Sequence, residues 1–317
     1  MIAVLAGGVG AARFLDGLVR VVDPREVTAV VNTGDDLVLH GLSISPDLDT
    51  VSYTLAGLVN PSTGWGRDGE SFAAMDALEQ LGAPAWFRLG DRDLGTHLYR
   101  TGRLAAGARL HEVTAELARA WGVQTRVLPM SDDPVRTRLE LADGGEEVEF
   151  QEYFVHRRHG VAVRRVRFAG AEASRPAPGV LDALAAADCV VVAPSNPVVS
   201  IGPILAVPGI APLLAQRRDR VVAVSPIVAG QAVKGPAARL LVELGGQSSA
   251  LGVARHLAHV AGTLVVDLAD AALAPEIEQV GVRCAIAATM MHTSEIAAEL
   301  ARATLAAVQA RPTAGGA

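Results

Sequence analysis

The sequence predicts an α/β fold of the Rossmann-like, doubly wound type, with a mainly parallel sheet and an inserted helical and hairpin cap region. Three observations lead to this prediction. Short β-branched runs alternate with Ala- and Leu-rich stretches of helical pattern, most of these runs end in or lead into Gly, Pro, Ser, Asn or Asp, and 50% of the 317 residues are hydrophobic. A chain of this length and composition can bury a large core.

The predicted strands are continuous apolar runs, which is typical of parallel strands buried on both faces. Because the carboxyl ends of parallel strands share one edge of the sheet, the loops that follow these runs should form the ligand site. Strands are expected at Ile2–Ala6, Val27–Asn32, Cys189–Ala193, Val221–Ser225, Leu264–Asp267 and Cys284–Ala287.

The middle of the chain has a different pattern. From about Pro61, helical stretches lead to Thr137–Leu141 and Glu147–Val155, two strand-like runs around an Asp-Gly-Gly turn signal, which predicts a hairpin. We therefore expect a nucleotide-binding α/β core at 1–60 and 188–310, an inserted cap region at 61–187, and a disordered tail at 311–317.

Composition excludes several functional classes. The net charge of −6 and the absence of a basic run give no attraction to nucleic acid. Cys189 and Cys284 each lie in an apolar run, as buried reduced thiols do. No stretch approaches the roughly 20 apolar residues of a membrane-spanning helix. We expect a cytoplasmic protein without a membrane or nucleic-acid partner.

The glycine-rich loop after the first predicted strand is the first candidate site. Gly7, Gly8, Val9 and Gly10 end the strand and open a helix, so that backbone N–H groups can approach an anion, and Arg13 can reach the same anion. The alternative is a tight turn without a ligand. The loop lacks a third spaced glycine and a following Gly-Lys-Ser/Thr, which argues against a nicotinamide fingerprint and a P-loop.

Carboxylates gather after the second strand. Asp35 and Asp36 follow an Asn-Thr-Gly turn, and Asp47 and Asp49 precede a helix predicted at Val51–Leu58. Such a cluster is suited to Mg²⁺, with a remaining acid acting as general base. The alternative is turn formation and helix capping, although four acids exceed what capping needs. His40, close by, could belong to the site or could equally be a packed loop histidine.

Arg88 and two later loops are further candidates. Arg88 follows two aromatic residues and could bind an anionic or planar ligand, while Asp91 and Asp93 could simply complement a helix dipole. Asn196 is suited to an amide edge such as that of guanine, and Lys234 to a phosphate, unless both belong to ordinary loops.

Together these segments resemble the 2-phospho-L-lactate transferase family of coenzyme F-420 biosynthesis, whose actinobacterial branch contains the phosphoenolpyruvyl transferases. The matching stretches are AGGVGAARF at 6–14, VNTGDD at 31–36, HGLSISPDLDTVSYTL at 40–55, WFRLGDRDLGTHLYRT at 86–101, PSNPVVSIGPILAVPGI at 194–210 and SP…KGP at 225–236. Ala11 departs from a glycine common in relatives, which makes the turn less permissive.

The resemblance implies a Mg²⁺-dependent, GMP-releasing transfer. A guanosine diphospho-linked three-carbon acid would donate its phospho-acyl portion to the terminal ribityl hydroxyl of the deazaflavin Fo. Catalysis would depend on positioning and charge neutralisation rather than on a covalent nucleophile. Whether the acid is lactate, enolpyruvate or glycerate is left open, because one or two contacts decide such a difference. A homodimer is compatible with the sequence but not required by it.

The resemblance also implies residue roles. Asp49 would be the main catalytic carboxylate with Asp47 beside it, although the residues alone leave open which acid is base and which is metal ligand. The acceptor site would contain Asp49, Thr50, Arg88 and His97; the donor site Gly7, Gly8, Val9, Gly10, Arg13, Ser195, Asn196, Ser225, Lys234 and Gly235; and the metal site Asp35, Asp36 and Asp49.

Two other functions compete with this interpretation. A regulatory sugar-nucleotide-binding protein of the gluconeogenesis-factor type has a similar glycine loop and Asp pair, but the segment Trp86–Thr101 is better suited to an aromatic acceptor. A nicotinamide oxidoreductase would require an acid at the ribose-reading position, whereas Asp35 and Asp36 come after a turn.

Overall fold

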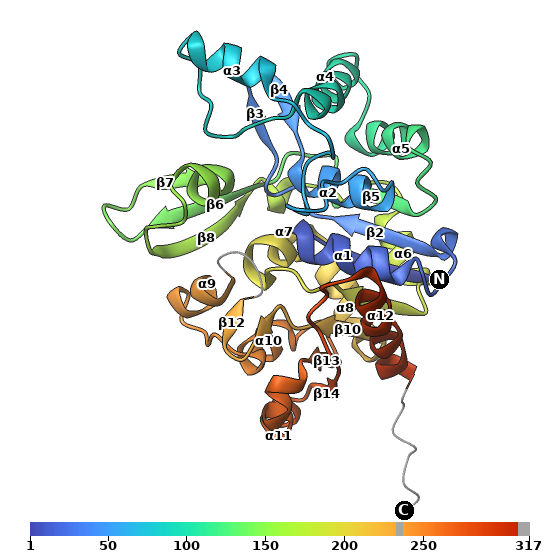
Figure 1. The fold of residues 1–317 in the computed structure, drawn as a ribbon. Coiled ribbons are helices and arrows are strands. Elements are labelled where there is room, and N and C mark those ends of the chain that lie inside the picture. The colour runs from blue at the N-terminus through green and yellow to red at the C-terminus, as the bar shows by residue number, and fades with distance from the viewer. Residues whose placement is uncertain (233–236, 310–317) are drawn as a thin grey trace, which may run out of the picture.

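A seven-stranded sheet forms the centre of the molecule in the computed structural model, which describes residues 1–232 and 237–309 (Figure 1). Every neighbouring pair in it is parallel. Its order is β14-β13-β10-β9-β1-β2-β5. The strands are β1 Ile2–Ala6, β2 Val27–Val31, β5 Arg126–Pro129, β9 Cys189–Val192, β10 Val221–Val224, β13 Thr263–Val266 and β14 Arg283–Ile286. The predicted fold class and six predicted strands are therefore confirmed, with ends that differ by a residue.

The edge strand β5 is an addition to the expected sheet. It pairs with β2 and lies inside the segment 61–187 that the sequence assigned to an insertion. Arg126 is exposed, whereas Val127 and Leu128 are buried. Such a short strand with a charged start and a terminal proline lacks the apolar pattern of the central strands, which explains why the sequence did not indicate it.

Helices cover both faces of the sheet, so alternate strand residues enter different cores. Val4 packs with Phe14 and Leu15 on the side of α1 Gly8–Leu18, whereas Leu5 belongs to the core of the opposite side. The helix α12 Ser294–Gln309 lies against α1 (Figure 1). The opposite face is covered by η3 Ala171–Ala173, α6 Val180–Ala186, η4 Pro197–Ile201, α7 Gly202–Ala206, α8 Ile210–Gln216, α9 Ala237–Glu243 and α10 Ala250–Leu257.

Further elements lie beside and above the carboxyl edge of the sheet in Figure 1. One group consists of the hairpin β3 Leu37–Leu39 and β4 Leu42–Ile44 with α2 Pro46–Leu55, whose Leu48 and Val51 pack into the core on the α1 side, and of the inserted helices α3 Ala73–Gln80, α4 Asp91–Ala105 and α5 Leu110–Ala120. The other is a three-stranded antiparallel sheet of β6 Arg136–Leu141, β7 Glu147–Glu149 and β8 Val163–Ala169 in the order β7-β6-β8. The predicted hairpin is confirmed as β6 and β7.

The predicted second strand of that hairpin, Glu147–Val155, is wrong beyond Glu149. The chain becomes helical at Phe150 and forms a π-helical turn, η2 Glu152–His156. Phe150 and Tyr153 are both buried. Residues three apart share one face of a helix but point to opposite faces of a strand, so burial of both aromatic rings favours the helical turn.

The remaining elements are short. They are η1 Pro24–Glu26, η5 Arg218–Arg220, β11 Ile227–Val228, β12 Gln231–Ala232, η6 Leu268–Leu273 and α11 Ala274–Gln279. Both cysteines are free thiols, and burial raises the pKa of Cys189 to about 12. In the described part of the chain no single helix could cross a membrane, although Pro197–Ala206 and Ile210–Gln216, bent by 95°, reach the necessary length and apolar composition as a pair. The predicted tail 311–317 lies outside the described residues.

Candidate active site

A cavity of about 660 Å³ opens at the carboxyl ends of β1, β2, β9 and β10. From β1 the chain builds the sheet toward β5, and it then returns to β9 beside β1 and continues in the other direction. Ligands of doubly wound sheets bind at this point of reversal. The cavity is bordered on the core side by the loops after β1 and β9 and on the other side by the inserted segments.

The glycine loop forms the core wall of the cavity. Gly7, Gly8, Val9, Gly10 and Arg13 all border it. Gly8 has a φ of 71°, which favours glycine. A Cβ atom at Gly10 would lie 2.2 Å from the Pro194 carbonyl oxygen, so this close approach of two loops requires glycine. The departure at Ala11 does not strain the turn, because Ala11 is a buried helical residue of α1.

The loop after β9 is joined to the glycine loop. The Ser195 hydroxyl donates to the Gly7 carbonyl at 2.8 Å. The Asn196 Oδ1 accepts from the Val198 amide at 3.0 Å, while its Nδ2 is buried without a hydrogen-bond partner among the described residues. A buried donor without a partner is uncommon, and at a cavity wall it is available to a ligand. Asn196 is thus placed where an amide contact was expected.

Of the remaining residues predicted for the donor site, the structure describes only Ser225. Ser225 borders the cavity, but its hydroxyl donates to the Ile227 carbonyl at 2.8 Å and so shapes its own turn. Lys234 and Gly235 lie outside the described residues.

The loop Thr289–His292, after β14, also borders the cavity and was missed by the sequence analysis. The Asp267 Oδ2 accepts from the Thr289 amide at 2.8 Å and from its hydroxyl at 3.0 Å, which fixes the start of this loop. Arg13 Nη1 donates to the Met291 carbonyl at 3.4 Å. The strand predicted at Cys284–Ala287 was the available signal, because its following loop must reach the same sheet edge.

Asp35 and Asp47 bring two buried carboxylates to the same wall. The Asn32 side-chain amide donates to Asp47 Oδ2 at 2.9 Å, and Asp35 Oδ1 has no hydrogen-bond partner in the described chain. Burial and the charge of Asp47 raise the pKa of Asp35 well above its ordinary value, and burial raises the pKa of Asp47 to about 6. Two desolvated carboxylates repel each other, and a cation between them would relieve this.

Asp36 is not among the residues that border the cavity, and its Oδ2 accepts from the Ser45 hydroxyl at 2.8 Å. Burial raises the pKa of Asp36 to about 7. The structure therefore brings Asp35 and Asp47 to the cavity wall and leaves Asp36 outside the lining.

The helix that carries Asp47 and Asp49 begins earlier than predicted. The sequence analysis placed this helix at Val51–Leu58, whereas α2 begins at Pro46, with Ser45 in the N-cap position. Proline at the first helical position is favourable because it has no N–H group to satisfy there. Asp47 and Asp49 consequently lie in the first turn, and the expectation that one of them caps the helix from outside is wrong.

Asp49 is held by an arginine that the sequence analysis did not identify. Arg100 of α4 is 2% exposed, donates to Asp49 Oδ2 at 3.1 Å through Nη1, and donates through Nη2 to Oδ1. Burial lowers the pKa of Arg100, but the charge and hydrogen bonds of Asp49 outweigh this and raise it. The Asp49 carboxylate therefore lies at the cavity in a fixed orientation, with both oxygens already hydrogen-bonded.

His97 belongs to the same buried group. Arg100 Nη1 lies 3.3 Å from His97 Nδ1, and a guanidinium can only donate, so Nδ1 accepts and the proton lies on Nε2. Burial lowers the pKa of His97 to about 4, consistent with a neutral ring. Its Nε2 has no partner in the described part of the chain. His97 and Thr50, both predicted for the acceptor site, border the cavity.

Asp91 and Asp93 have different environments. Asp91 is half-buried at the start of α3, where its Oδ2 accepts from the Ala73 amide at 3.0 Å. Asp93 borders the cavity, and burial raises its pKa to about 7. Complementing a helix dipole therefore does not explain why Asp93 lies at the cavity.

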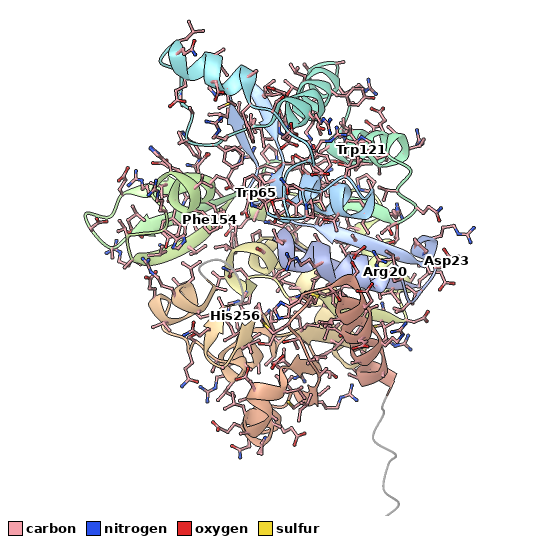
Figure 2. All side chains as sticks on the ribbon, viewed as in Figure 1. Arg20, Asp23, Trp65, Trp121, Phe154 and His256 are labelled. Atoms are coloured by element: carbon pink, nitrogen blue, oxygen red, sulfur yellow. The ribbon has the colours of Figure 1, made fainter. Side chains whose placement is uncertain are left out.

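Arg88 borders the cavity from its rim. Its guanidinium pairs with Asp76 at 2.7 Å and lies over the Phe72 ring, 4.8 Å from the centroid. Phe87 and Leu89 beside it, Trp65 and Phe154 contribute an apolar wall. Trp65 and Phe154, labelled in Figure 2, approach the cavity from two separate inserted segments.

His40 is a turn residue. It has a φ of 52° and Gly41 a φ of 75°, and the two connect β3 to β4. Two consecutive residues with positive φ form the preferred two-residue hairpin turn. Of the two interpretations left open for His40, the packed loop histidine agrees with this position.

Among the described residues no group of three or more His, Cys, Asp or Glu side chains could hold a metal by itself. Asp35 and Asp47 nevertheless fit Mg²⁺, which is commonly bound by one or two carboxylates together with substrate phosphates. Asp49 fits less well because Arg100 already occupies both of its oxygens.

The chain is similar to known proteins over most of its length. The chain is 46% identical over 310 residues to the phosphoenolpyruvate transferase of Streptomyces griseus, covering 96% of this chain and 97% of that protein. It is 42% identical over 292 residues to the 2-phospho-L-lactate transferase of Methanothermobacter thermautotrophicus, covering 92% and 93%.

A crystal structure of a UPF0052 family member from Bacillus halodurans is similar in fold alone, with a TM-score of 0.62, 19% identity, and coverage of 96% of this chain and 98% of that one. The model of the 2-phospho-L-lactate transferase CofD family matches residues 2–303. The resemblance seen in the sequence is thereby confirmed: this chain belongs to the 2-phospho-L-lactate transferase CofD family.

Proposed function

We propose that this protein transfers a phospho-three-carbon-acid group, phospholactate or phosphoenolpyruvate, from a guanosine diphospho-linked donor to the terminal hydroxyl of the deazaflavin Fo, in coenzyme F-420 biosynthesis. The observation that carries the proposal is the continuity of one cavity, which connects an anion-binding glycine loop to an apolar wall across a cluster of buried carboxylates. The names of the relatives support the reaction class.

The donor diphosphate would lie over the glycine loop. Backbone N–H groups at the start of α1 offer hydrogen bonds to phosphate oxygens, and Arg13 adds a charge-assisted contact. The free Nδ2 of Asn196 would contact the guanine base. During transfer the acceptor oxygen forms a bond to the phosphorus that carries the acid, the bond to the bridging oxygen breaks, and GMP leaves with that oxygen.

Asp35 and Asp47 would hold Mg²⁺ in this proposal, which would neutralise charge on the diphosphate. This changes the metal set expected from the sequence, Asp35, Asp36 and Asp49. Asp36 lies outside the cavity lining, and the oxygens of Asp49 already accept from Arg100. Dialysis against EDTA should abolish transfer, and added Mg²⁺ should restore it. Undiminished turnover without the metal would contradict this assignment.

Asp49 would act on the acceptor. Its carboxylate borders the cavity and is fixed by Arg100, so it can accept a hydrogen bond from the ribityl hydroxyl and take its proton as the new bond forms. The unpartnered Nε2–H of His97 would contact an oxygen of the same acceptor, and Arg88 would lie at its outer end.

Incubation of the protein with Fo, Mg²⁺ and each guanosine-diphospho acid, followed by mass analysis of the deazaflavin, tests the proposed function. The expected result is one product, Fo that carries the phospho-three-carbon-acid group, together with a stoichiometric amount of GMP. GDP, but not NAD, should raise the melting temperature. No product, together with stabilisation by UDP-sugars and not by GDP, would favour the regulatory alternative.

A further inference from the structure

Gln151 is a largely buried polar side chain at the cavity, and its amide has no hydrogen-bond partner among the described residues. It is 7% exposed and borders the cavity. Its side-chain amide makes no hydrogen bond to any residue that the structure describes. Buried amide groups in folded proteins are nearly always hydrogen-bonded, so this amide is suited to a ligand rather than to the fold.

The local structure explains why Gln151 is turned inward. The strand β7 ends at Glu149, and the helical turn that follows buries Phe150 and Tyr153. Gln151, between these rings, occupies the start of η2. Had the chain continued as the predicted strand, neighbouring residues would have alternated between faces, and Phe150 and Gln151 could not both border the cavity as they do.

The surroundings of Gln151 define the ligand chemistry. Phe150 and Phe154, in the same helical turn as Gln151, stack with centroids 5.4 Å apart and border the cavity, which Phe87 and Trp65 also border (Figure 2 labels Trp65 and Phe154). Flat apolar walls are suited to a planar ring. A glutamine amide carries both donor and acceptor atoms, and their complement is a neighbouring N–H and C=O pair.

We propose that the side-chain amide of Gln151 is a specificity-determining contact that binds the N–H and C=O edge of a planar heterocyclic substrate. The glycine-loop side already has an amide nitrogen without a partner among the described residues, Asn196 Nδ2. Gln151 belongs to the inserted aromatic wall, so the ring it reads is that of the acceptor. Naming this ring as the deazaflavin of Fo rests on the proposed function, whereas the contact itself rests on the burial and the missing partner of Gln151.

The test compares ligands that keep or lose the N–H group. Dissociation constants are measured for Fo, N3-methyl-Fo, GDP and N1-methyl-GDP with the wild type, Gln151→Leu and Gln151→Met. Gln279→Leu on α11, an exposed glutamine far from the cavity, is the matched control. Melting curves show which variants are folded, and Met supplies a flexible alternative if Leu packs poorly.

The wild type should bind Fo about tenfold more tightly than N3-methyl-Fo. Both Gln151 variants should bind Fo about tenfold more weakly and lose this discrimination, while GDP binding and the Gln279 control stay unchanged. If the Gln151 variants instead bind GDP more weakly and no longer distinguish it from N1-methyl-GDP, Gln151 contacts the guanine ring, and its assignment to the acceptor ring is wrong.

Unchanged constants for all four ligands in folded Gln151 variants would overturn the inference. A wild type that does not bind Fo would refute the proposed acceptor instead. In that case the dissociation constants of GDP and N1-methyl-GDP alone test the Gln151 contact. Equal binding of these two ligands in the wild type and in every variant would again overturn it.

Discussion

The two walls of the cavity are built in different ways. The wall that we propose binds the donor, the donor wall, consists of backbone and short loops at the ends of β1 and β9, where Gly10 closely approaches Pro194. The wall that we propose binds the acceptor, the acceptor wall, consists of side chains from α2 and from the inserted segments, including the buried pair of Asp49 and Arg100, which are 51 residues apart in the sequence. The first is encoded locally and the second by tertiary contacts. Substitutions on the two walls should therefore affect different ligands and different steps.

The largest expected effect is that of Asp49→Asn on the acceptor wall. Asn preserves shape but cannot take a proton, so the transfer rate should fall roughly 10²–10⁴-fold while GDP still binds. Steady-state rates measure the loss, and GDP-induced melting shifts show that the donor wall is intact. Near-normal turnover would reduce Asp49 to a structural partner of Arg100 and direct attention to Asp47 and Asp93.

Arg100→Met should destabilise the protein. It leaves the Asp49 carboxylate buried without its guanidinium, and breaking a buried ion pair costs about 3–5 kcal/mol. Denaturant unfolding measures the change. Arg103→Met, which removes an exposed partner of Glu116 from the same helix, is the matched control and should have a much smaller effect. Equal stability of the two variants would show that the Asp49 pair is not buried in solution.

Gly10→Ala should disturb the donor wall. Its Cβ would lie 2.2 Å from the Pro194 carbonyl oxygen, so the two loops must separate, and overpacking of this kind costs about 1–3 kcal/mol. GDP binding should weaken while Fo binding changes little. Gly102→Ala in α4, where the added methyl group meets open space, should be neutral or stabilising. Unaltered GDP affinity in Gly10→Ala would separate the glycine loop from donor binding.

The sequence analysis identified several residues that border the cavity on the donor wall, because their signals are local. A continuous apolar strand followed by glycines indicates a ligand loop, and Gly7, Gly8, Gly10 and Ser195 all border the cavity. The loop Thr289–His292 follows the same rule but contains no glycine signal, and it was missed. The start of α2 was misplaced because Pro46 resembles a loop residue although it suits the first helical position.

The acceptor wall was predicted only in part, for a physical reason. An arginine in a polar helix pattern indicates a solvated side chain, so nothing local distinguished buried Arg100 from exposed Arg103. Asp35 and Asp36 are adjacent in the sequence, yet only Asp35 borders the cavity, since the direction of each side chain depends on the turn. Gln151 was assigned to a strand whose end is decided by burial of Phe150 and Tyr153.

The most direct measurement of the central claim, that one cavity holds the donor and the acceptor on opposite walls, is a crossed binding experiment with Arg13→Ala and Arg88→Ala. Both arginines border the cavity, one at the glycine loop and one at the rim of the inserted wall. Arg13→Ala should weaken GDP binding about 10–100-fold and leave Fo binding unchanged. Arg88→Ala should weaken Fo binding and leave GDP binding unchanged. Loss of the same ligand in both variants would contradict the two-wall arrangement.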